Sequence, residues 1–163
     1  MALTTLQYQS LKAAIIADGA LSAQPNNSDG AFAIAAALNQ VASPAWVVWR
    51  TDVSTADCKK ATVWTEYIGR SAGERDAWVF MLSNGIINPS QANIRQGIND
   101  IFSGVGGAAS RTALLAIAKM NATRAQKIFS TGTGTDVTPA TLDANISESF
   151  QLSYADVEIA RQS

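Results

Sequence analysis

The stretch from Ser110 to Phe129, SRTALLAIAKMNATRAQKIF, carries the longest uninterrupted helical pattern in the chain. Its apolar side chains recur at the three- and four-residue spacing that places them on one side of a helix, facing a core. These side chains are Leu114, Leu115, Ile117, Ala118, Ala122, Ala125, Ile128 and Phe129. A helix of this length spans about 30 Å, the width of a small domain. The sequence therefore predicts one long helix around which the other helices pack.

Shorter helices are predicted from cap residues followed by apolar residues at helical spacing. The first begins at Thr4 or Thr5 and ends at Gly19, which is expected to take a left-handed conformation, and the second begins at Asn27 or Ser28. Three more are predicted over residues 54–68, 71–84 and 89–103, the first two beginning at the cap residues Ser54 and Ser71, with Trp78 expected in the core. The segment SPAWVVWRTDV is expected to be extended. We therefore expect an all-α fold, a compact bundle of about five to six helices.

The composition changes after Phe129 to Thr, Gly, Asp and Ser with few apolar residues. Such a segment has little core of its own, and docking on a partner would order it. We therefore predict a helical body over residues 1–129 and an extended C-terminal arm over residues 130–163, ending in a short helix capped by Ser153. The side chains expected to dock on a partner protein are Phe150, Leu152, Tyr154 and Val157.

Charged residues make up only 15% of the 163 residues, and apolar residues make up 47%. An average soluble domain has about 25% charged residues. A surface this poor in charge suggests that copies of the chain or other proteins cover part of it. The alternative is a monomer whose surface is rich in Ser, Thr, Asn and Gln.

The residues that usually carry catalysis are scarce. The chain has no histidine and a single cysteine, Cys58, so we expect no thiolate metal cluster and no histidine base. The glycines of TGTGTD lack the following Lys-Ser/Thr of a phosphate-binding loop. We therefore expect no enzyme activity, cofactor or metal site. The N-terminal sequence also predicts neither a signal peptide nor a membrane span.

Positive charge is concentrated in the predicted long helix. Lys119, Arg124 and Lys127 lie there, and no acidic residue occurs between Ser110 and Phe129. This basic face is either solvated or contacts an acidic protein partner or DNA in a channel. The four tryptophans, Trp46, Trp49, Trp64 and Trp78, either stack on bases or, for at least two of them, pack in the core.

Two segments resemble proteins of tailed bacteriophages: TADCKKATVWTEYIGRSAGERDAWVFMLSNGIINPSQANIRQGINDIFSG and NATRAQKIFSTGTGTD. The similarity is to the head-to-tail neck proteins, meaning adaptor or head-completion proteins. It implies a non-enzymatic virion protein, made in the host cytoplasm, that forms a ring of about twelve copies. The ring would bind the portal protein on one side and tail-side neck proteins on the other. DNA would pass through the middle with non-specific contacts.

Two other roles remain open at the level of sequence. One is a nucleic-acid-binding packaging or regulatory factor, which the net charge of −1 disfavours. The other is a different minor phage structural protein. Salt dependence separates the first from an adaptor, since DNA binding weakens steeply as salt rises.

Overall fold

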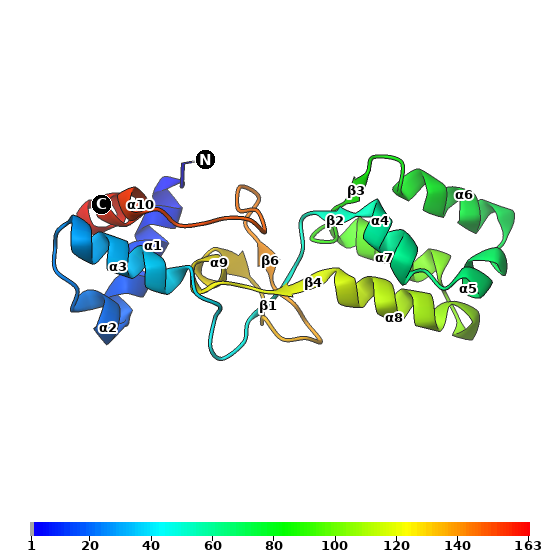
Figure 1. Cartoon of the computed structure of the whole chain (residues 1–163), viewed down its shortest axis with the longest axis horizontal. Helices are drawn as coiled ribbons and strands as arrows, with labels where there is room; N and C mark the ends of the chain where they lie inside the picture. Colours follow the sequence, from blue (N-terminus) through cyan, green and yellow to red (C-terminus); the bar gives the residue numbers. More distant parts are fainter. Residues whose placement is uncertain (1) are drawn as a thin grey trace. The chain divides into compact units, whose positions relative to one another are not determined.

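The computed structural model describes residues 2–163, and the chain forms two compact units (Figure 1). The first, the terminal unit, combines Met1–Val48 with Asn121–Ser163 and so contains both ends of the sequence. The second, the central unit, is the continuous stretch Trp49–Met120. In Figure 1 the blue and red ribbon lies in the terminal unit and the green ribbon in the central unit.

Helices from both ends of the sequence build the terminal unit. They are α1 (Thr5–Ala17), α2 (Gly19–Ser22), α3 (Ser28–Leu38), α9 (Arg124–Ile128) and α10 (Tyr154–Gln162). Helix α10 packs against both α1 and α3. The buried apolar side chains come from early and late segments alike and include Leu11, Ile15, Ile34, Leu38, Phe129, Leu142, Ile146, Leu152 and Val157.

Hydrogen bonds of side-chain amides also join the two ends of the sequence in this unit. The buried Gln7 donates from Nε2 to Asp143 Oδ2 at 3.0 Å and to Asn145 Oδ1 at 2.8 Å. Asn39 donates to the carbonyl of Leu152 at 2.9 Å and accepts from its N–H at 2.8 Å. The terminal unit is therefore held by polar as well as apolar contacts between distant parts of the sequence.

The central unit is a continuous run of short helices. They are α4 (Thr55–Ala61), α5 (Trp64–Ile68), α6 (Ala72–Met81), α7 (Ala92–Ile101), the 3-10 turn η1 (Val105–Gly107) and α8 (Ala108–Ile117). One apolar cluster fills its core: Val53, Cys58, Trp78, Ile87, Ile98, Ile101, Phe102 and Leu114. The central unit thus has a core of its own.

The strands of the chain are short and occur in pairs. Strand β2 (Val53–Ser54) pairs antiparallel with β3 (Ile86–Ile87), with Val53 opposite Ile87. Strand β5 (Ser130–Thr131) pairs antiparallel with β6 (Thr141–Leu142). A third two-stranded sheet consists of β1 (Val47–Trp49) and β4 (Lys119–Asn121).

The predicted all-α bundle of five to six helices is wrong. Over residues 2–163 the structure has ten α-helices, most of them short, and 54% of the chain is helical. The remainder includes the antiparallel strand pairs, so the content is mixed. The physical reason is that capping side chains end or restart several predicted helices.

The predicted helix from Ser110 to Phe129 is wrong for this reason. Helix α8 ends at Ile117, and the chain then runs extended through β4. Thr123 next caps α9: its side chain accepts from the N–H of Gln126, and the Gln126 side chain accepts from the N–H of Thr123. The expected inner residues are nevertheless largely buried, namely Leu114, Ala118, Ala122, Ala125 and Phe129.

The structure divides the chain differently from the expected body and arm. Residues 130–163 belong to the terminal unit and contribute Leu142, Ile146, Leu152 and Val157 to its buried interior. The expected short helix is present as α10, with Ser153 and Asp156 forming its capping box. The sequence suggested an arm because the apolar partners of these residues lie at the other end of the chain.

Candidate functional site

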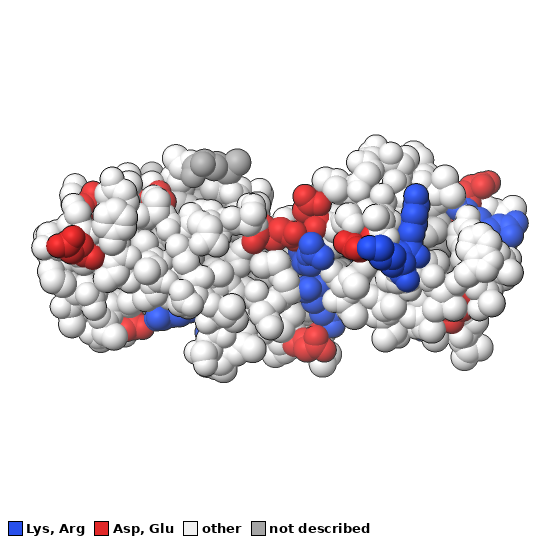
Figure 2. All heavy atoms as spheres, in the orientation of Figure 1, with Lys and Arg blue, Asp and Glu red and all other residues white. Residues whose placement is uncertain are grey.

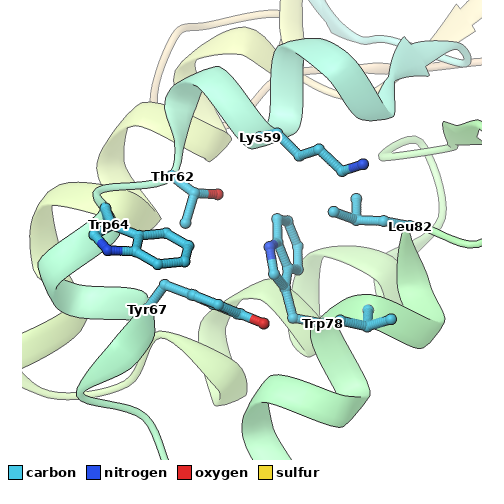
Figure 3. A pocket seen from close by; sticks show the side chains of 7 residues that line it. Lys59, Thr62, Trp64, Tyr67, Trp78 and Leu82 are labelled. Carbon is cyan, nitrogen blue, oxygen red and sulfur yellow. The ribbon is translucent and has the colours of Figure 1, made fainter.

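An apolar hollow of the central unit lies between α4, α5 and α6 (Figure 3), and we call it the aromatic pocket. It has a volume of about 290 Å³. In Figure 3 Trp64 and Tyr67 lie on one side of the Trp78 ring and Leu82 on the other. The residues that line it are Lys59, Thr62, Trp64, Tyr67, Trp78, Val79 and Leu82.

A break between two helices creates one side of the pocket. Residues 54–68 were predicted as a single helix, but α4 ends at Ala61 and α5 begins at Trp64. The hydroxyl of Thr62 donates to the carbonyl of Cys58 at 2.8 Å, and the backbone there becomes extended. This break turns Trp64 and Tyr67 toward the pocket. Trp64 remains 68% exposed, and its ring lies 5.5 Å from that of Tyr67.

Helix α5 is too short to be stable alone and is anchored on α8. The carboxylate of Glu66 accepts hydrogen bonds from the N–H groups of Ala109 at 3.1 Å and Ser110 at 2.7 Å, in the first turn of α8. The Ser110 hydroxyl accepts from the N–H of Val63 at 2.9 Å. The hydrogen bonds from Ser110 lower the pKa of Glu66. Glu66 therefore stays ionised and holds the aromatic rim in place.

The floor of the pocket is part of the core. Trp78 is only 3% exposed and meets Phe102 edge to face, with ring centroids 5.2 Å apart and planes at 85°. This geometry is a favoured one for aromatic pairs. The indole is thus fixed from behind and presents a rigid apolar surface to the pocket.

One cation lies at the pocket, on Lys59. Its neighbour Lys60 pairs with Asp57 at 3.6 Å, whereas Lys59 forms no ion pair with any residue from 2 to 163. An exposed ammonium beside aromatic walls favours ligands that combine an apolar group with a carboxylate. The same charge disfavours the quaternary ammonium ligands that aromatic cages bind.

The pocket offers little chemistry beyond binding. Burial raises the pKa of the Cys58 thiol to about 11, so the thiol is protonated near neutral pH and is a poor nucleophile. The carboxylates of Asp57 and Glu74 accept hydrogen bonds from the cap hydroxyls of Ser54 and Ser71, which lower their pKa values. Among residues 2–163, no group of three or more His, Cys, Asp or Glu is arranged to hold a metal ion.

The structure does not bring the three predicted basic residues onto one helix face. Lys119 lies in β4, whereas Arg124 and Lys127 lie in α9. Arg124 pairs with Asp18 at 2.6 Å. Lys127 lies 4.8 Å from the centroid of Trp46, and Lys119 lies 5.9 Å from that of Trp49. The break between α8 and α9 is the reason for their separation.

The tryptophans divide between two environments. Only Trp78 is buried, so the expectation of at least two core tryptophans is wrong. Arg95 lies 4.6 Å from the Trp49 ring centroid, and the Trp46 indole donates to Ser130 Oγ at 3.0 Å. Cation–π contacts therefore occupy the Trp46 and Trp49 rings, and stacking of nucleic-acid bases on these rings would have to displace them.

The four predicted docking residues also differ in their surroundings. Leu152 and Val157 are buried in the terminal unit, and Phe150 meets Phe129 edge to face at 5.8 Å. Tyr154 is 40% exposed and stacks on Phe32. Of the four, Tyr154 presents the clearest outward surface, and sequence reasoning missed its partner on α3.

Within the described part of the chain, no helix has the length and apolar character needed to cross a bilayer. Comparison of the chain with protein-family models, with curated proteins and with solved structures finds no match.

Proposed function

We propose that the chain is a non-enzymatic structural protein that assembles with copies of itself and with other proteins. The observation that carries this proposal is a charge-poor surface with many large apolar side chains exposed. The face drawn in Figure 2 is mostly free of charged residues. Exposed apolar side chains occur on both units, among them Leu6, Ile16, Phe32, Trp64, Val79 and Phe80. Surfaces of this kind are typical of protein contacts.

The resemblance of the sequence to phage neck proteins indicates where this assembly would occur. We propose an adaptor ring in the neck of a tailed phage, bound to the portal protein on one side and to tail-side neck proteins on the other. DNA would pass through the ring, whose protein would be part of the virion. The aromatic pocket is compatible with protein contacts, because aromatic side chains and one lysine line it.

Purified protein mixed with portal protein tests the proposal directly. We expect negative-stain images of rings on the portal, and mass measurement of a complex with several copies of the chain per portal. A parallel sample without portal measures self-association. A protein that stays monomeric alone and fails to bind portal would contradict the proposal.

A nucleic-acid-binding accessory role has weaker support, because Arg124 and Lys127 already contact Asp18 and Trp46. We expect weak DNA binding that disappears between about 50 mM and 200 mM salt. Tight binding at physiological salt would favour this rival.

A further inference from the structure

The two units carry opposite net charge. The terminal unit has four Lys and Arg against seven Asp and Glu, giving −3, and the central unit has eight against six, giving +2. A terminal unit therefore attracts the central unit of another copy more than it attracts another terminal unit. This asymmetry favours head-to-tail contacts between copies.

The terminal unit presents an exposed aromatic pair, the aromatic knob, made of Phe32 on α3 and Tyr154 on α10. The two rings stack with centroids 4.2 Å apart and planes at 24°. Phe32 is nevertheless 54% exposed. Because each ring supports the other, the knob is preorganised, and little side-chain entropy remains to be lost on binding.

Carboxylates flank the aromatic knob. Asp29 lies one turn before Phe32 on α3 and forms no ion pair with residues 2–163. Glu158 lies one turn after Tyr154 on α10 and accepts a hydrogen bond from Ser28 Oγ at 2.9 Å. The nearby cation Arg161 donates to the carbonyls of Gln24 and Pro25. The knob thus combines an aromatic surface with an available carboxylate, the ligand chemistry that suits the aromatic pocket.

The aromatic pocket has room for such a group. A cavity of about 150 Å³ lined by apolar side chains is enough to hold benzene. The pocket has about 290 Å³, aromatic walls from Trp64 and Trp78, and the ammonium of Lys59, which forms no ion pair with residues 2–163.

We propose that the aromatic knob of one copy docks into the aromatic pocket of the next copy, with Asp29 facing Lys59. The contact joins two different surfaces and is therefore heterologous, so each copy can bind one neighbour on either side. Repetition closes a ring where the rotation allows it and otherwise gives a filament. This inference rests on the proposed assembly and assigns the contact between its subunits.

Two single variants and a matched control test the contact. Phe32→Ala removes the knob, and Trp64→Ala removes a wall of the pocket. Phe80→Ala deletes a ring that is 81% exposed and lies outside the pocket. All three side chains are exposed, so the fold should persist. By sedimentation velocity we expect the first two to raise the concentration for self-association at least about tenfold, and Phe80→Ala to behave as the wild type.

Mixing the two defective variants tests the head-to-tail geometry. Phe32→Ala retains an intact pocket and Trp64→Ala an intact knob, so an equimolar mixture can form one contact per pair. We expect mixed dimers that do not grow into larger assemblies. A contact between identical surfaces would give no such rescue, and this result would overturn the proposal.

Charge reversal and cross-linking add independent measurements. Asp29→Lys or Lys59→Glu should each weaken association, and the double variant should restore it. Chains carrying Asp29→Cys and Lys59→Cys keep the aromatic knob and the aromatic pocket, and they should form a disulfide when mixed, while the buried Cys58 stays unreactive.

The outcomes separate this contact from the proposed function. Rings on the portal formed equally well by wild type, Phe32→Ala and Trp64→Ala would overturn the contact and leave the adaptor role standing. A wild type that neither self-associates nor binds portal would overturn both.

Discussion

The central unit is one continuous stretch of chain, whereas the terminal unit joins two stretches from opposite ends of the sequence. The central unit closes around an apolar cluster that includes Trp78 and Phe102. Polar links join distant residues in both units, over 44 residues between Glu66 and Ser110 in the central unit and over 136 residues between Gln7 and Asp143 in the terminal unit. Contacts between distant residues cost more chain entropy, so polar groups that specify the pairing are useful there. We therefore predict that a change near either end of the chain destabilises the terminal unit and leaves the central unit folded.

Removal of residues 137–163 should have the largest effect. It deletes α10 and exposes apolar side chains on α1 and α3, which α10 covers. We expect the terminal unit to unfold while the central unit keeps its structure, since the central core lies wholly within residues 49–120. Hydrogen exchange measured segment by segment would show both results. An unchanged terminal unit would mean that residues 137–163 act as a dispensable arm.

Large-to-small substitutions in the two cores compare the units directly. Trp78 and Phe129 are both buried, as the sequence predicted. Trp78→Ala and Phe129→Ala should each cost about 3 to 5 kcal/mol, because a cavity replaces packed atoms. Chemical denaturation with exchange measurements should assign the first loss to the central unit and the second to the terminal unit. Equal loss in both units would show that they unfold together.

The amide of Gln7 offers a smaller test, specific to the terminal unit. Gln7→Ala leaves the partners of a buried amide, Asp143 and Asn145, without their donor. We expect a cost of about 1 to 3 kcal/mol in the free energy of unfolding. Gln96→Ala is the matched control, because among residues 2–163 that exposed amide bonds only to Asp100, one turn away. If the Gln7 variant were as stable as the Gln96 variant, the hydrogen bonds of Gln7 would not contribute to the stability of the terminal unit.

The sequence correctly predicted helix caps, which depend on neighbouring residues. It did not predict contacts between residues far apart in the chain. The caps at Thr4, Asn27, Ser54, Ser71 and Ser153 are confirmed. Each involves residues three apart, so the sequence alone contains the interaction. Thr123 and Gln126 form the same kind of cap inside the predicted long helix. It was missed because the apolar spacing there favoured one uninterrupted helix.

One local signal was missed: Gly19 was expected to end the first helix in a left-handed conformation, but its φ is not positive, and Asp18 caps α2 there through the N–H groups of Ala20 and Leu21. Other features depend on partners that no short stretch of sequence contains. The aromatic pocket exists because α4 stops at Ala61 and Glu66 anchors α5 on α8. The knob pairs Phe32 with Tyr154 from the other end of the chain. Tertiary contacts decide the pocket and the knob, so apolar spacing could not predict either of them.

The smallest expected effect concerns the pH dependence of the anchor that shapes the pocket. The folded-state pKa of Glu66 lies below its ordinary 4.5, chiefly through hydrogen bonds from Ser110. A lowered pKa means that ionised Glu66 stabilises the fold above pH 4.5 and that this contribution is lost as pH falls through the folded pKa. Glu66→Gln removes the titrating group at nearly the same shape. The central unit of the variant should therefore depend less on pH in this range.

Hydrogen exchange at several pH values from about 6 to about 3 provides the measurement. The terminal unit is the internal control, since it contains neither Glu66 nor α8 and should respond to acid equally in both proteins. Asp18 there also has a lowered pKa, from the N–H groups of Leu21 and Ala20 and from Arg124, so the terminal unit has an acid response of its own. An identical response of the central unit in both proteins would mean that Glu66 does not anchor α5, and that the pocket rim is held by packing alone.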